Sequence, residues 1–412
     1  PECPRDYETA KQKLRETLSE AVQLRMRSDV PLGAFLSGGI DSTIICGLMQ
    51  KFSSRPVKTF SIGFPVKSFD ERTFARAAAE HLGTEHYEQV VEPSALQILP
   101  KLIWHYDEPF ADSSAIPCLY LAEMTRRQVT VALSGDGGDE LFAGYRRYQA
   151  VRISGWLDHL PRFVQRSLGS DLVQRIPTPV AQYSKLRRLK KLCSALGESP
   201  ERRYLKWVSI LDADRRKALY HPDFEQRLGT ADAADFLLDA YQLCPKRDFI
   251  TRTTAVDVLT YLPCDILTKV DISTMAYSLE SRNPFLDHHV VDLAAQMPIE
   301  WKLSGQISKK ILIESFPELL PDMIRTRSKM GFGVPLDHWF RGELRPLLED
   351  ILLSQRALER GLFQPGEVKR LVEEHQACTW DHSHRLWGLL VLELWYRTFI
   401  DGEIPTGPAT GL

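Results

Sequence analysis

The chain has 412 residues, of which 43% are hydrophobic, a composition that suits a folded protein with two or three packed regions. Its 52 basic and 54 acidic residues nearly balance, so the net charge of −2 gives no electrostatic reason to expect nucleic acid or an anionic membrane as partner. The longest apolar stretches are far shorter than the roughly 20 residues that span a bilayer. Seven scattered cysteines without a C-x-x-C motif fit a reducing compartment, so we expect a cytoplasmic protein.

Residues 1–150 alternate between helical and extended patterns. Residues 7–28 place apolar side chains at helical spacing, and the apolar run at 30–36 that follows is typical of a buried strand. The remaining elements predicted in this region are helices at 42–52, 71–82, 94–105 and 117–125, and strands at 57–62, 86–91 and 129–133. Strands that alternate with helices form α/β folds, so we predict a mostly parallel, doubly wound sheet with helices on both faces.

Beyond residue 150 the pattern changes. Residues 151–250 contain long segments of mixed polar and apolar residues without a convincing strand, and most of the remaining chain also favours helices. We therefore predict an α/β core at 1–150, a helical insertion at 151–250, and a mainly helical region at 251–412 that completes the functional site. Basic residues and leucines interleave at helical spacing between Lys185 and Leu192, which predicts an amphipathic helix with a charged outer face.

A glycine-rich loop directly follows each of two predicted strands. The first loop reads Ser37-Gly38-Gly39-Ile40-Asp41-Ser42, and the second reads Ser134-Gly135-Asp136-Gly137-Gly138-Asp139-Glu140. Anions bind in α/β proteins where a strand ends and a helix begins, and glycines let backbone N–H groups approach a phosphate closely. The first loop lacks the lysine of a Walker A motif, so it is better suited to grip a pyrophosphate product, which points to cleavage between the α- and β-phosphates.

Each loop carries one aspartate beside two glycines, Asp41 in the first and Asp139 in the second. Mg²⁺ is usually held by one or two carboxylates together with phosphate oxygens. Either aspartate by itself could instead be the N-cap of the helix that follows. Because the two loops match, we predict that both aspartates bind one Mg²⁺ with its polyphosphate.

These loops resemble those of a known family. The first loop looks like the PP-loop of N-type ATP pyrophosphatases, and together with Ser134–Tyr145 it makes the chain resemble the synthetase domain of the asparagine synthetase B family. Four further similar segments are 107–114, 267–271, 284–287 and 329–335, within a resemblance that covers roughly residues 7–400. The resemblance implies an adenine nucleotide alpha hydrolase-like fold and a carbon–nitrogen ligase that needs ATP and Mg²⁺.

The resemblance implies a two-step amide synthesis. ATP adenylates the side-chain carboxylate of aspartate and releases pyrophosphate, and ammonia then displaces AMP to give asparagine. The expected ATP-binding residues, including those already argued from the loop chemistry, are Phe35, Ser37, Gly38, Gly39, Asp41, Ser42, Ile62, Ser134 and Gly135. The expected catalytic residues are Asp136 and Lys309, the substrate-binding residues are Lys269 and Asp271, and the metal ligands are Asp41 and Asp139.

Several alternatives stay open at this point. Lys310 adjoins Lys309, so the sequence does not decide which lysine is catalytic. Nothing before Ser28 resembles the glutaminase domain of glutamine-dependent members, so we expect free ammonia as nitrogen donor, unless a glutaminase was removed or lies on another chain. Whether the protein forms a homodimer is also open.

The acceptor carboxylate is the least certain substrate. Asp136 stands where many family members carry glutamate, and Ser281-Arg282-Asn283 also departs from the usual family sequence. The first alternative is therefore an amidotransferase-like, β-lactam synthetase-like or lasso-peptide cyclase-like enzyme that acts on another carboxylate. The second is a catalytically silent scaffold, against which the intact first loop argues.

Overall fold

A computed structural model of the chain describes residues 4–66, 70–91, 95–158, 195, 197–327 and 333–403. The chain divides into two compact units, each built from three segments. The sheet unit comprises Pro1–Pro93, Ser114–Gln149 and Cys244–Val334, and the helical unit comprises Ser94–Ser113, Ala150–Leu243 and Pro335–Leu412. Among the described helices, none combines the length and the apolar character that crossing a membrane requires. The amphipathic helix predicted at 185–192 lies outside the described residues.

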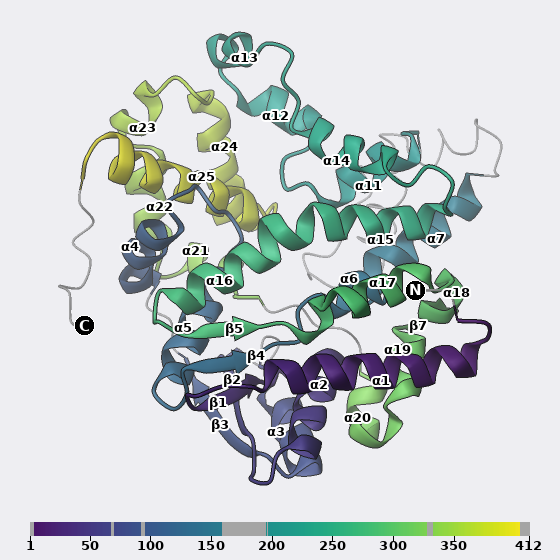
Figure 1. Ribbon diagram of the computed structural model, residues 1–412. Coiled ribbons are helices and arrows are strands. Elements are labelled where there is room, and N and C mark those ends of the chain that lie inside the picture. The colour runs from purple at the N-terminus through teal and green to yellow at the C-terminus, as the bar shows by residue number, and fades with distance from the viewer. Residues whose placement is uncertain are drawn as a thin grey trace. The chain divides into compact units, whose positions relative to one another are not determined.

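A five-stranded parallel sheet forms the centre of the sheet unit (Figure 1). Its strands are β1 (Leu32–Phe35), β2 (Lys58–Gly63), β3 (Glu85–Val90), β4 (Val131–Leu133) and β5 (Glu280–Arg282), in the spatial order β3-β2-β1-β4-β5. The predicted α/β fold with a mostly parallel sheet is therefore confirmed. The direction in which strands are added reverses between β1 and β4, which is where open α/β sheets bind ligands beyond their strand ends.

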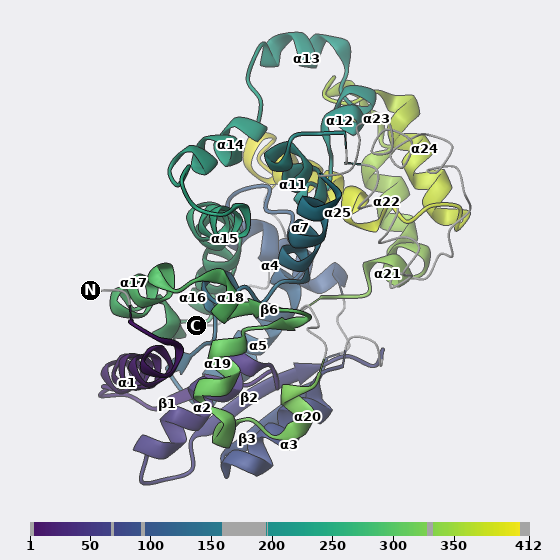
Figure 2. The same cartoon turned by 90° about the vertical axis from the view of Figure 1, so that its right-hand side faces the viewer.

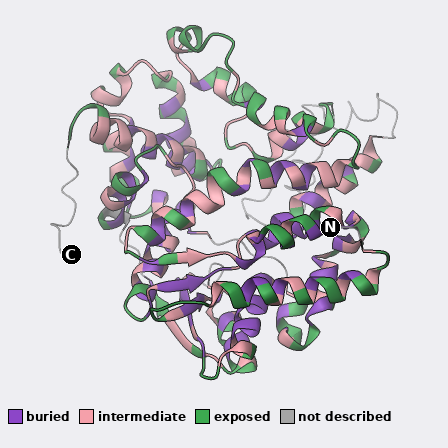
Figure 3. Cartoon of the chain, viewed as in Figure 1, coloured by how far each residue is buried: buried purple, intermediate pink, exposed green. Residues whose placement is uncertain are grey.

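Helices cover both faces of this sheet. The longer helices of the sheet unit are α1 (Tyr7–Arg25), α2 (Ile40–Phe52), α3 (Arg72–Leu82), α5 (Ala115–Arg126), α15 (Phe249–Leu259), α16 (Thr268–Met275), α17 (His288–Gln296) and α19 (Lys310–Ser315). Helices α1, α2, α3, α17 and α19 share one apolar core, whereas α5 and α16 pack together on the opposite face (Figure 1). Strand β4 is buried along its whole length, whereas β5 beside it is exposed or only partly buried (Figure 3).

The C-terminal third of the sheet unit contains strands that the sequence patterns missed. The short elements of the sheet unit that follow β4 in the chain are α6 (Gly138–Leu141), η2 (Leu262–Leu267), η3 (Pro284–Leu286), α18 (Ile299–Lys302), β6 (Leu303–Ser304), β7 (Ile307–Ser308), η4 (Pro317–Leu319) and α20 (Asp322–Arg325). Strand β5 has three residues, Glu280, Ser281 and Arg282, none of them apolar. It is a strand because it pairs with β4, so no local pattern announces it.

The described part of the helical unit consists of helices and their connections. They are α4 (Ala95–Tyr106), α11 (Pro200–Val208), α12 (Ala213–Leu219), α13 (Pro222–Leu228), α14 (Ala234–Gln242), α21 (Leu336–Arg341), α22 (Arg345–Leu352), α23 (Gln355–Glu359), α24 (Pro365–Gln376), α25 (Ser383–Trp395) and η5 (Tyr396–Ile400). Helix α7 (Arg146–Leu157) begins in the sheet unit and ends in this one. In the described residues of this unit, extended pairing is limited to an isolated bridge between Tyr220 and Phe363.

A buried histidine lies near the end of α24. The side chain of His375 is inaccessible to solvent, its Nδ1 accepts a hydrogen bond from the backbone N–H of His382 at 3.1 Å, and its ring meets that of Phe340 edge-on. Burial lowers the pKa of His375 from 6.5 to about 4, and the positive charge of Arg341 acts in the same direction. The imidazole is therefore neutral at pH 7.

We predict that this histidine makes the fold sensitive to mild acid. Between pH 6.5 and 4 the unfolded chain binds a proton at His375 that the folded chain does not. The free energy of unfolding therefore decreases as the pH is lowered through this range, by ~3 kcal/mol in all. His375→Gln should remove this contribution and reduce the pH slope of urea unfolding followed by circular dichroism. Equal slopes in the variant and the parent chain would contradict the prediction.

Candidate active site

The first glycine loop is shaped by close packing. It connects the end of β1 at Phe35 to the start of α2 at Ile40. Gly38 has a φ of 67°, and a Cβ at this position would lie 2.4 Å from the carbonyl carbon of Phe74, so no other residue fits. The hydroxyls of Ser37 and Ser42 are 3.1 Å apart and hydrogen-bond each other across the loop. The loop thus places two hydroxyls at the N-terminus of α2.

Arg327 contacts both the first glycine loop and the start of α3. Its Nη1 donates a hydrogen bond of 2.9 Å to the backbone carbonyl of Gly38, and its Nη2 pairs with Glu71. Its guanidinium carbon also lies 4.0 Å from the centre of the Phe74 ring. A single arginine, which the sequence analysis did not identify, therefore ties the first loop to the start of α3. The similar segment at 329–335 follows it, but residues 328–332 lie outside the described part of the chain.

The second glycine loop lies directly against the first. Strands β1 and β4 are paired, with Ala34 opposite Leu133, so the loops that follow them emerge side by side. A Cβ on Gly135 would lie 2.8 Å from the backbone nitrogen of Ser42, and one on Gly138 would lie 2.5 Å from the Oδ1 of Asp41. Glycines in the second loop are therefore required for the first loop to approach.

Asp41, Asp139 and Lys309 meet at one point of the sheet unit. The aspartates lie in the first turns of α2 and α6, whose N-caps are glycines without side-chain capping bonds, so neither aspartate acts as an N-cap. The Nζ of Lys309 is 2.6 Å from the Oδ1 of Asp139 and also contacts the Oδ2 of Asp41. Only 3% of Lys309 is exposed, so its ammonium group compensates two carboxylates that are themselves largely removed from water.

The chemistry of these groups suits a hard divalent cation. Two carboxylates that converge on one position, beside backbone N–H groups fit for phosphate, are the protein ligands that Mg²⁺ takes together with substrate phosphates. The Lys309 ammonium group, which contacts both carboxylates, marks where their negative charge is concentrated. Asp41 and Asp139 can therefore hold Mg²⁺.

The two neighbouring lysines have different surroundings. Lys309 enters the aspartate cluster, whereas the Nζ of Lys310 lies 4.9 Å from the centre of the Tyr7 ring on α1. Lys309 is the N-cap residue of α19 and has a left-handed backbone, with a φ of 56°. This turn separates the directions of the two side chains, and only Lys309 contacts the predicted metal ligands.

Two residues of the second motif that the sequence analysis did not single out matter for this geometry. A Cβ on Gly144 would lie 2.0 Å from the Oδ1 of Asp139 and 2.1 Å from the Cε of Lys309, so glycine is needed where these side chains meet. Glu140 is buried and accepts a hydrogen bond from the Tyr145 hydroxyl at 2.5 Å. Burial raises the pKa of Glu140 to about 7, and the adjacent negative charge of Asp139 adds to this effect.

The other predicted ATP-binding residues lie at strand ends. Phe35 ends β1, and the buried Ile62 is the penultimate residue of the neighbouring strand β2. The hydroxyl of Ser134, which follows β4, donates a hydrogen bond of 2.7 Å to the Oδ2 of Asp136. These positions surround the point at which the strand order reverses, and Gly135 is the residue that packs against the first loop.

The predicted substrate-binding pair is not brought together on one face. Both residues lie on α16, where Lys269 is buried with its Nζ 3.9 Å from the Oδ1 of Asp265, while Asp271 is exposed. Residues two apart on a helix point in directions that differ by about 200°. A substrate that contacts Lys269 would therefore reach Asp271 only around the side of the helix.

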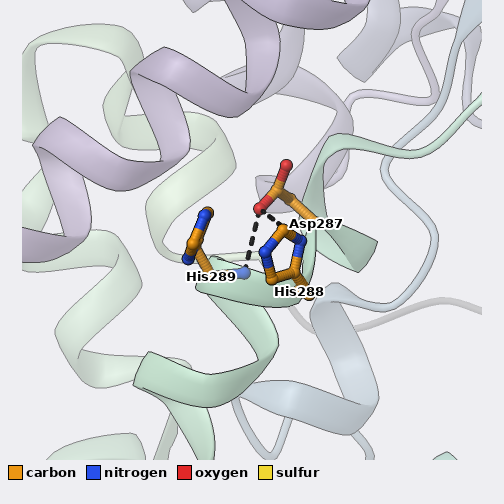
Figure 4. Close-up of side chains that lie close together, drawn as sticks. All are labelled: Asp287, His288 and His289. Carbon is orange, nitrogen blue, oxygen red and sulfur yellow. Dashed lines mark hydrogen bonds and ion pairs between the residues drawn. The ribbon is translucent and has the colours of Figure 1, made fainter. Parts of the chain in front are cut away.

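A second group of metal-ligand residues lies at the start of α17 (Figure 4). The ligand atoms of Asp287, His288 and His289 lie within 4.8 Å of one another, the one such trio found in the described residues. One oxygen of Asp287 accepts the His289 backbone N–H at 2.9 Å, and the other pairs with Arg25 at 2.9 Å. The carboxylate thus caps the helix and binds an arginine, and both the arginine and the helix N-terminus disfavour a cation.

Comparisons with known proteins show which family this chain is similar to. The asparagine synthase family profile matches residues 13–397. The chain is 33% identical over 393 residues to asparagine synthetase 1 (glutamine-hydrolyzing) of Bacillus subtilis strain 168, with 94% of this chain and 59% of that protein covered. It is 34% identical over 397 residues to a putative asparagine synthetase (glutamine-hydrolyzing) of Mycobacterium tuberculosis strain H37Rv, with 95% and 58% covered.

A more distant relative is the amidase chyE of Penicillium rubens, which is 25% identical over 417 residues and covers 90% of this chain and 59% of that protein. The chain therefore spans slightly less than three fifths of the length of these curated relatives.

We predict that Gly144→Ala disables the site while leaving the fold in place. The new methyl group would collide with Asp139 and Lys309, and displacing reacting groups by about 1 Å commonly costs on the order of 100-fold in rate. Pyrophosphate release from Mg²⁺-ATP measures this effect. Gly155→Ala is the matched control, because a Cβ on Gly155 would meet no atom of the described residues within 4 Å. Equal activity of the two variants would show that Gly144 is not needed for this approach.

Proposed function

The chain belongs to the asparagine synthase family, and from this premise we propose that it is a carbon–nitrogen ligase that forms an amide through an acyl-adenylate. A carboxylate oxygen bonds to the α-phosphorus of ATP and pyrophosphate leaves, after which ammonia bonds to the acyl carbon and AMP leaves. We favour aspartate as the carboxylate, which gives asparagine. The observation that carries the proposal is the meeting of Asp41, Asp139 and Lys309 beside two glycine loops.

The first loop is the proposed phosphate site. Its backbone N–H groups and the hydroxyls of Ser37 and Ser42 lie where the N-terminus of α2 favours negative charge. Asp41 and Asp139 would hold Mg²⁺, which supplies positive charge to the phosphate oxygens. The adenosine moiety is assigned to the strand ends that carry Phe35, Ile62, Ser134 and Gly135.

Lys309 is the proposed stabiliser of the transition state. Adenylation develops negative charge on the α-phosphoryl oxygens and on the leaving pyrophosphate. An ammonium group that is buried beside the phosphate loop lies close to where this charge develops, which makes such a group effective in catalysis. Asp136 is assigned a place near the reacting carbon, and Lys269 and Asp271 stay our candidates for binding the substrate amino acid.

We propose ammonia as the immediate nitrogen donor. The two asparagine synthetase relatives are named as glutamine-hydrolyzing, and this chain spans less than two thirds of their length. The proposal therefore includes supply of the ammonia by a glutaminase domain or subunit. We also propose a cytoplasmic location. Free cysteines such as Cys46, Cys264 and Cys378 in the described residues fit its reducing conditions.

A different acceptor carboxylate is the second candidate. The carboxylate of Asp136 accepts a hydrogen bond of 2.7 Å from the Ser134 hydroxyl of its own loop, and its side chain is one methylene shorter than the glutamate of many family members, which leaves room for another carboxylate as acceptor. A distant relative carries the name amidase, so proteins of similar sequence do not all carry the name asparagine synthetase.

We predict that Lys309→Ala loses amide formation but keeps most ATP binding. Removing one preorganised donor typically costs about 3 kcal/mol, or roughly 100-fold in kcat. Lys310→Ala is the control, because this lysine lies over the Tyr7 ring and does not contact the aspartates. ATP affinity from calorimetry and amide formation from mass spectrometry check the pair. Normal turnover in Lys309→Ala, or an equal loss in both variants, would refute the role of Lys309.

We predict that the chain, given ATP, Mg²⁺, aspartate and ammonium, yields asparagine, AMP and pyrophosphate in equal amounts. Mass spectrometry of the products measures this directly, and omitting aspartate is the control. Pyrophosphate release that does not depend on aspartate, but responds to another carboxylate, would favour the second candidate. Replacing ammonium by glutamine should abolish product formation by this chain, and glutamine use would contradict ammonia as the donor.

A further inference from the structure

The central lysine lies on a backbone that needs support from outside its own segment. Lys309 has φ 56° and ψ 30°, the left-handed conformation, which a residue with a Cβ keeps only where surrounding contacts hold it. It follows the β6–β7 hairpin directly and precedes α19, so its direction depends on where that hairpin sits. Figure 2 shows α18, β6 and α19 following one another along this segment.

The hairpin is too small to hold its own position. Its strands have two residues each, with Leu303 opposite Ser308 and Ser304 opposite Ile307. Isolated two-stranded hairpins are marginally stable in water even when they are longer than this. The side chain of Ile307 is 55% exposed and contributes little packing. The position of the hairpin must therefore come from neighbouring elements.

Helix α7 supplies two contacts to the hairpin from adjacent residues. The fully buried Tyr148 belongs to a small apolar cluster that contains Leu303 of β6. The next residue, Gln149, uses one amide nitrogen for two bonds, donating to the backbone carbonyl of Gln306 at 2.9 Å and to the Oγ of Ser308 at 3.2 Å. One bond reaches the turn of the hairpin, and the other reaches the residue immediately before Lys309.

We propose that Gln149 is a positioning residue that holds the β6–β7 hairpin where Lys309 can reach the two aspartates. Helix α7 is the next helix after α6, which carries Asp139, so one stretch of chain carries this aspartate and fixes the approach of the lysine. Without the amide, rotation near Ser308 would swing the long side chain of Lys309 away from the carboxylates. The expected effect of Gln149 on catalysis rests on the proposed function, whereas its role in holding the hairpin does not.

The test compares Gln149→Met, which keeps the length of the side chain but donates no hydrogen bond, with the parent chain. Gln364→Met is the matched control, because the Gln364 amide also donates to two carbonyls, those of Ala218 and Tyr220, in the helical unit. Hydrogen–deuterium exchange of residues 303–312 reports on the hairpin, and steady-state kinetics give kcat and the KM for ATP. Thermal unfolding of all three chains excludes a general loss of stability.

We expect Gln149→Met to exchange faster in the hairpin and to lose about tenfold or more in kcat, with the KM for ATP and the unfolding temperature nearly unchanged. Gln149→Glu, which also cannot donate and sets a negative charge against the Gln306 carbonyl, should lose at least as much. Unchanged hairpin exchange in Gln149→Met would overturn the proposal. Faster exchange with an unaltered kcat would overturn it too, because the hairpin would then not position Lys309.

The same experiment separates this inference from the proposed function. If the parent chain forms no amide with any carboxylate, the proposed function fails. The exchange of residues 303–312 in Gln149→Met still decides whether Gln149 holds the hairpin.

Discussion

The contact of one ammonium group with two carboxylates is the interaction on which the rest of the site depends. Asp41, Asp139 and Lys309 are all largely removed from water, and buried charges are tolerated only where opposite charges and hydrogen bonds compensate them. These residues lie far apart in the sequence, so the fold must bring three separate segments to one point. Glycines at 138 and 144 make room for the approach, because a Cβ at either would enter the cluster.

The order of the strands is what brings two of those segments together. Strands β1 and β4 are neighbours, although β2, β3 and the four helices α2, α3, α4 and α5 lie between them in the chain. Both strands are followed by a glycine loop and the first turn of a helix, so backbone N–H groups and carboxylates face the same place. An anion and a cation can then bind side by side, which is the requirement for holding a metal polyphosphate.

Residues outside the cluster keep it in place. Arg327 joins the first loop to the start of α3, and Gln149 on α7 hydrogen-bonds to the hairpin that precedes Lys309. Charges that are fixed before a substrate arrives stabilise a transition state more effectively than charges that must be reoriented, because no reorganisation is needed during the reaction. The left-handed backbone of Lys309 is compatible with this arrangement only while its neighbours hold it.

The sequence by itself determined the elements up to β4, the parallel α/β fold and the two glycine loops, because hydrophobic periodicity and glycine placement are local signals. Only the tertiary structure distinguished Lys309 from Lys310, since a single left-handed residue sends them to different surroundings. It alone also revealed β5, whose polar residues become a strand by pairing with β4, and the need for a glycine at 144. Such features arise from contacts between distant segments, which no local pattern records.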